Sequence, residues 1–182
     1  YEPAQAQLTF TAAPKPVVAE VTVTPKDYDG STTANVSAAV KTGDLVNSAD
    51  TFTLTGLAGT YDNANAGTGK TVTLDDTGAT KADDSGKYAV SYPAAVKGDI
   101  TAKSVTVTVT LSGNDLKKDD TDGSYYYNYD GSEKTPNVTV TAGDGTVLAD
   151  SDYDVSIIDN KNVGYAMVTV TAKAGGNYAF TV

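Results

Sequence analysis

The chain has 182 residues and a formal net charge of −10, a balance that disfavours nucleic acid and anionic membrane surfaces as partners. It contains no His and no Cys, and all thirteen basic residues are Lys, so it lacks the usual proton-transfer group, the ligands of structural zinc sites and the bidentate guanidinium. Hydrophobic residues make up 40% of the chain, with no Trp and three Phe, which predicts a folded protein with a light core of Val, Ala, Thr and Tyr.

The first half of the chain alternates branched apolar residues with hydroxyl residues. This period of two is typical of half-buried antiparallel strands and predicts strands at 17–24, 51–55, 70–74 and 87–92. The one candidate for a short helix is 33–41, although its β-branched residues argue against helix.

The second half repeats the same pattern, with strands predicted at 104–111, 137–141, 153–158 and 166–171. Asp-Gly pairs that tolerate positive φ stand between strands in both halves, at residues 29–30, 122–123, 130–131 and 144–145. Short strands separated by such turns indicate an all-β fold, either small β-sandwiches (Ig-like) or partly open β-barrels.

Three motifs occur twice in the same order, which indicates a tandem duplication. Tyr-Asp-Gly stands at 28–30 and 129–131, Asp-Asn-x-Asn-x-Gly at 62–67 and 159–164, and Gly-x-Tyr at 86–88 and 176–178. We therefore expect two related domains, at 17–103 and 104–182, in an elongated arrangement because no flexible linker separates them. Residues 1–16 are expected to be the tail of a preceding repeat or a linker, since Tyr1 precedes Lys15 as Tyr88 precedes Lys103.

The first copy resembles the YDG domain, a repeat of large bacterial surface proteins, through residues 24–34, 43–44 and 65–72. The second copy is similar to related tandem repeats of Gram-positive surface proteins, and it departs from them in the acidic entry at 115–122. The residues that carry this similarity are 129–131, 135–136, 148, 152–153, 160, 162–164 and 176–178. These resemblances imply an all-β repeat of a secreted or cell-surface adhesin-like protein, displayed on a bacterial cell surface or cell wall. They bring no catalytic residues and no cofactor.

Two clusters are candidate sites. The acidic run before Gly123 places Asp119, Asp120 and Asp122 as candidate calcium ligands, although Lys118 and Tyr129 fall where an EF-hand loop needs its first ligand and its Glu. A solvated hairpin tip is the alternative. Tyr125, Tyr127 and Tyr129 alternate, so a strand would place them on one face, where they would either stack on a ligand such as a sugar or fill the core.

The sequence favours a non-catalytic structural spacer that displays a distal binding region. Its expected partners are neighbouring repeats of the same polypeptide, with no nucleic acid and no membrane insertion in this segment. The alternative is a module that binds a glycan or a host protein through the tyrosines. An enzyme is not expected, because no motif places paired carboxylates in a cleft.

Overall fold

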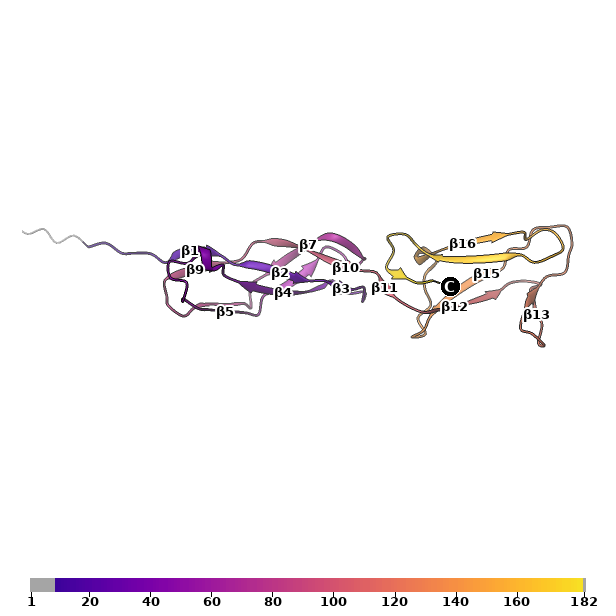
Figure 1. Cartoon of the computed structure of the whole chain (residues 1–182), viewed down its shortest axis with the longest axis horizontal. Coiled ribbons are helices and arrows are strands. Elements are labelled where there is room, and N and C mark those ends of the chain that lie inside the picture. The colour runs from indigo at the N-terminus through magenta and orange to yellow at the C-terminus, as the bar shows by residue number, and fades with distance from the viewer. Residues whose placement is uncertain (1–8, 182) are drawn as a thin grey trace, which may run out of the picture. The chain divides into compact units, whose positions relative to one another are not determined.

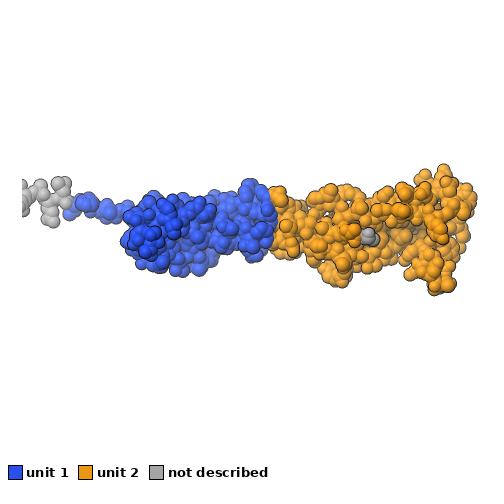
Figure 2. Space-filling view, viewed as in Figure 1, with its two compact units in different colours: residues 1–25, 32–63, 69–99 blue, residues 26–31, 64–68, 100–182 orange. Residues whose placement is uncertain are grey.

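The computed structural model describes residues 9–181, and it is an all-β protein, as predicted. Its residues group into two compact units (Figure 2). Unit 1 comprises residues 1–25, 32–63 and 69–99, and unit 2 comprises residues 26–31, 64–68 and 100–182. Unit 2 thus contains the first Tyr-Asp-Gly turn together with the second repeat. In the described part of the chain, no helix is long and apolar enough to cross a membrane.

A six-stranded, nearly closed sheet forms the main body of the first repeat (Figure 1). Its strand order is β2 (Glu20–Thr24), β4 (Thr33–Ala39), β6 (Ala58–Tyr61), β7 (Gly67–Asp75), β10 (Ala95–Thr101) and β3 (Lys26–Asp27). The two edge strands, β2 and β3, are consecutive in the chain with only Pro25 between them, so the sheet curls back on itself. Pro25 lacks an N–H group and suits this break between strands.

A short parallel pair closes the first repeat. β1 (Lys15–Val18) runs beside β9 (Tyr88–Ser91), with Lys15 opposite Tyr88. The N–H groups of Lys15 and Ala19 donate to the carbonyls of Lys87 and Ser91, both at 2.8 Å. A hairpin of β5 (Phe52–Thr55) and β8 (Thr80–Asp83) and the short 3-10 helix η1 (Thr42–Asp44) complete this repeat.

The second repeat is built from three antiparallel pairs and one parallel pair. Figure 1 shows β16 (Tyr153–Ile158) on one side of unit 2 and β12 (Val107–Ser112) and β15 (Asn137–Ala142) on the other. β12 pairs with β15, and β16 pairs with β17 (Met167–Ala172). The remaining elements are β11 (Lys103–Ser104), β13 (Lys117–Lys118), β14 (Tyr125–Tyr126), β18 (Tyr178–Ala179) and the 3-10 helix η2 (Asp150–Asp152).

The cores are small, as the composition predicts. In unit 2 the buried cluster lies between the β12–β15 pair and the β16–β17 pair. It consists of Val140, Ala142, Leu148, Tyr153 and Val170. The buried side chains of unit 1 are Val17, Ala19, Ala34, Tyr61, Val72 and Tyr88. The expectation that Thr would share in the core is wrong for the described residues, because no Thr among them is buried.

Most predicted strands are present, with differences at their ends. The segment 33–41 is not a helix but contains β4, as its β-branched residues favour. The predicted strand at 17–24 is split between β1 and β2, and the one at 104–111 between β11 and β12. The segment 98–103, at the expected boundary between the two domains, contains the end of β10 and the start of β11. The expected repeat tail at 1–16 lies in part outside the described residues, and residues 9–14 form no strand.

The duplication extends to the strand register. In the second repeat β11 runs parallel to β18 with Lys103 opposite Tyr178, the counterpart of Lys15 opposite Tyr88. The N–H of Lys103 donates to the carbonyl of Asn177, as that of Lys15 donates to Lys87. Each repeat is therefore closed by the same parallel pairing of its first strand with its Gly-x-Tyr strand.

Candidate functional site

Both Tyr-Asp-Gly motifs fold as Asx-type turns, as the sequence predicts. Oδ1 of Asp29 accepts the N–H of Ser31 at 2.8 Å, and Oδ1 of Asp130 accepts the N–H of Ser132 at 2.9 Å. The glycines that follow have φ of +75° and +81°, a region that favours glycine. The shared turn geometry gives a structural reason for the presence of Tyr-Asp-Gly in both repeats.

A lysine in each turn binds the aspartate. Lys26 Nζ lies 2.8 Å from Oδ1 of Asp29 and also donates to the carbonyl and the hydroxyl of Ser31. Lys134 Nζ lies 2.5 Å from Oδ2 of Asp130. These bonds favour the ionised carboxylates. The ammonium of Lys26, followed by the N–H of Ser31, lowers the pKa of Asp29 to about 2, and Lys134 and Ser132 hold the pKa of Asp130 well below its usual range.

The lowered pKa of Asp29 predicts a pH-dependent contribution to stability. Because the folded chain holds the carboxylate ionised more firmly than the unfolded chain does, the contribution is complete above about pH 4 and is lost as the pH falls to about 2. We expect Asp29→Asn, which keeps an acceptor for Ser31, to be less stable than the wild type at neutral pH and equally stable near the lower limit. Urea unfolding followed by circular dichroism across this window measures the difference, and a pH-independent difference would contradict the assignment.

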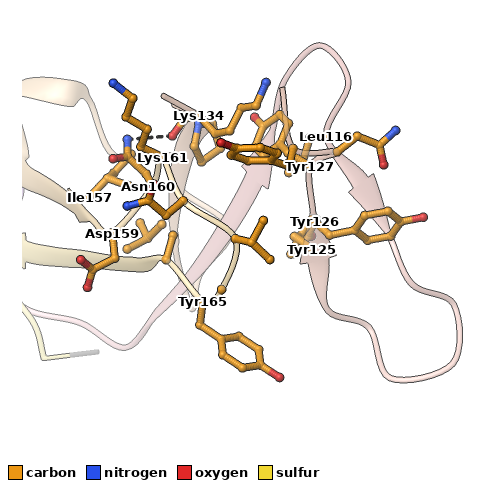
Figure 3. A pocket seen from close by; sticks show the side chains of 18 of the residues that line it. Leu116, Tyr125, Tyr126, Tyr127, Lys134, Ile157, Asp159, Asn160, Lys161 and Tyr165 are labelled. Atoms are coloured by element: carbon orange, nitrogen blue, oxygen red, sulfur yellow. Dashed lines mark hydrogen bonds between the residues drawn. The ribbon is translucent and has the colours of Figure 1, made fainter. Parts of the chain in front are cut away.

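A cavity of about 530 Å³ opens on unit 2 (Figure 3). One wall is Leu111, Ile157 and Val168, from β12, β16 and β17, and the opposite wall is the tyrosine segment 125–129. The Asp159–Gly164 loop forms its rim and is fixed to Lys134. The N–H of Lys134 donates to the carbonyl of Asn160 at 2.9 Å, and Nδ2 of Asn160 donates to the carbonyl of Lys134 at 3.0 Å.

The structure brings Tyr125, Tyr127 and Tyr129 to this cavity, but not as a regular strand. Only Tyr125 and Tyr126 lie in β14, where they are 39% and 46% exposed. Tyr127 is half-buried with the Lys134 ammonium 5.7 Å from its ring centre, and Tyr129 is 65% exposed. The three tyrosines therefore do not share one face of a strand, because Tyr125 and Tyr129 are exposed and Tyr127 is half-buried.

Sequence reasoning missed part of this site. Tyr126 and Tyr165 also line the cavity, and Tyr165 is fully exposed and points away from the other tyrosines in Figure 3. The repeated Asp-Asn-x-Asn-x-Gly motif was the signal in the sequence that could have pointed to this part of the site, since it forms the connection between β16 and β17. The sequence did not show that this loop lies beside the tyrosine segment.

The carboxylates of the acidic run bind backbone groups. Oδ1 of Asp119 accepts the N–H of Thr121, and Oδ1 of Asp122 accepts the N–H of Ser124, so both carboxylates cap turns. The N–H of Thr121 lowers the pKa of Asp119, and the hydroxyl of Ser124, followed by its N–H, lowers the pKa of Asp122. Across residues 9–181, no three His, Cys, Asp or Glu side chains are grouped so that they could hold a metal ion. Asp119, Asp120 and Asp122 as calcium ligands stay a prediction.

Comparison with known proteins identifies the first repeat. Residues 13–96 match the YDG domain family, so this part of the chain contains a YDG domain. The match begins before β1 and ends within β10. Comparisons with curated proteins and with solved structures gave no match.

Proposed function

We propose that this chain is a non-catalytic spacer module of a bacterial cell-surface adhesin-like protein, which displays a distal binding region. The proposal is carried by the parallel pairing of the first strand of each repeat with its Gly-x-Tyr strand, β1 with β9 and β11 with β18. Because the two strands of each pair run in the same direction, the chain enters the first strand and leaves the second at opposite ends of that pair, as a stalk segment requires.

The same pairing suits a segment under tension. A force applied between the start of β1 and the end of β9 loads their hydrogen bonds in shear, so they must break together rather than one after another. Pro16 has no N–H group, but this does not weaken the pair. The N–H groups that donate across it belong to odd-numbered residues such as Lys15 and Ala19, and Pro16 is at an even-numbered position.

Single-molecule pulling tests the spacer role. The chain has no Cys, so handles can be attached through engineered pairs, and Lys15, Lys87 and Ser91 are exposed positions for them. We expect a higher unfolding force for the pair Lys15→Cys/Ser91→Cys, which shears β1 from β9, than for the matched pair Lys15→Cys/Lys87→Cys, which peels them apart. Equal forces in the two geometries would contradict a load-bearing role for this pairing.

A glycan- or host-protein-binding module is the second candidate. It is favoured by the exposed rings of Tyr125, Tyr126 and Tyr129 around the cavity, because exposed tyrosines supply rigid amphipathic contact area. Binding to a glycan or matrix-protein array that Tyr125→Ala abolishes would support this function over the spacer alone.

A further inference from the structure

Unit 2 includes two loops of the first repeat. They are residues 26–31, which contain the Tyr-Asp-Gly turn, and residues 64–68, which contain the end of the Asp-Asn-x-Asn-x-Gly motif. Both loops contact the Gly-Asn-Tyr sequence at 176–178, the second copy of Gly-x-Tyr. One copy of each duplicated motif therefore lies at the same place in unit 2, although the three are far apart in the chain.

Asn177 binds the second of these loops through both polar atoms of its side chain. Its Oδ1 accepts the N–H of Ala66 at 2.8 Å, and its Nδ2 donates to Oδ1 of Asn65 at 3.3 Å. A side-chain amide carries an acceptor and a donor, so it matches a loop that presents an N–H group beside a carbonyl oxygen. Asn177 and Ala66 are both half-buried, which limits the competition from water for the shorter bond.

Tyr178 binds the Tyr-Asp-Gly turn. Its ring meets that of Tyr28 edge-on, with the ring centres 5.5 Å apart, which is a favoured arrangement of two aromatic rings. The ring of Tyr178 also packs against the buried cluster of unit 2. The N–H of Tyr28 donates to the carbonyl of Thr101 at 2.8 Å, so the turn is held through its backbone as well. The turn of the first repeat is thereby connected to the core of the second.

The first copy of Gly-x-Tyr makes different contacts. Lys87 occupies the position of Asn177, because each of them accepts, through its carbonyl, the N–H of the lysine in the first parallel strand of its repeat. Nζ of Lys87 lies 2.9 Å from Oδ1 of Asp50, within unit 1. A lysine side chain has donors and no acceptor, so Lys87 cannot accept an N–H group as Asn177 does.

We propose that Asn177 is a recognition residue, which binds the Asp-Asn-x-Asn-x-Gly loop of the other copy and thereby fixes the order in which the two repeats are joined. The loop of the first repeat fits the Gly-Asn-Tyr sequence of the second. The reverse order would place Lys87 against the loop in place of Asn177. Because the parallel pairing has the same register in both repeats, the difference between them lies in this side chain and not in the backbone.

Hydrogen exchange of single amides in the full chain, measured by NMR, tests this assignment. Asn177→Lys introduces the residue of the first copy, and Asn177→Asp keeps an acceptor for the N–H of Ala66. Both changes keep the backbone bond from Lys103 to the carbonyl of residue 177, and the first repeat accommodates a lysine in the same register. The amide of Gly69 is the matched control, because it also donates to a side chain, Oδ1 of Asp99 at 2.7 Å, but within unit 1.

We expect the amide of Ala66 to exchange about tenfold faster in Asn177→Lys than in the wild type, and at close to the wild-type rate in Asn177→Asp. The amide of Gly69 should exchange at the same rate in all three chains. An unchanged rate at Ala66 in Asn177→Lys, an equal acceleration in Asn177→Asp, or a parallel change at Gly69 would each overturn the proposal. The spacer role is independent of these outcomes, because amide exchange reports a contact in the unloaded chain and pulling reports the response to force.

Discussion

Replacing Tyr61 with Ala is expected to lower the free energy of unfolding of unit 1 by about 3–5 kcal/mol, the range for removal of a large buried aromatic side chain. Tyr61 is 2% exposed and is among the largest fully buried side chains of the described residues. It lies in β6 opposite Val72, whose side chain is completely buried, so the sheet has little freedom to close the space. Urea unfolding followed by circular dichroism measures the loss.

Tyr61→Phe is the matched control, because it keeps the ring and removes the hydroxyl that donates to the carbonyl of Asp99. The expected loss is smaller, about 1–3 kcal/mol, since it arises from a hydrogen bond and not from a cavity. Burial raises the pKa of Tyr61, so the hydroxyl stays protonated and can donate throughout the physiological range. If the Ala and Phe variants lost equal stability, ring packing would not be the main contribution of this residue.

β10 shows why the sequence predicts some strands and not others. β7, β15 and β17 alternate Val with Thr and were predicted, because one of their faces is buried and the other is solvated. β10 reads Ala-Val-Lys-Gly-Asp-Ile-Thr, where Gly98 stands at a buried position that the alternation assigns to a large apolar residue. Glycine is needed there because the Val23 side chain is too close for a Cβ, and this contact cannot be read from local sequence.

The candidate site shows the same limit. The sequence identified Tyr125, Tyr127 and Tyr129 from their alternation, and these residues do line one cavity. It could not identify the cavity itself, since the opposite wall comes from β12, β16 and β17, which are distant in the chain.

Replacing Tyr88 with Ala is expected to cost about 3–5 kcal/mol of the free energy of unfolding of unit 1. The ring is 6% exposed and packs against Phe52 with centres 5.5 Å apart. The hydroxyl accepts the N–H groups of Val46 and Asn47, at 2.7 and 3.3 Å, and donates to Oδ2 of Asp50 at 3.0 Å. One side chain therefore supports both the parallel pair β1–β9 and the segment that follows η1. Thermal or urea unfolding measures the loss.

Two matched variants separate these contributions. Tyr88→Phe keeps the ring and leaves the N–H of Val46 without its hydroxyl acceptor, so we expect a loss of about 1–3 kcal/mol. Tyr178→Ala changes the same Gly-x-Tyr position in the second repeat, where the ring is only half-buried, so it should cost less than Tyr88→Ala. The motif then has a common role in closing each repeat and a different energetic weight in each copy. Equal losses of unfolding free energy at the two tyrosines would contradict the expectation that the more buried ring contributes more.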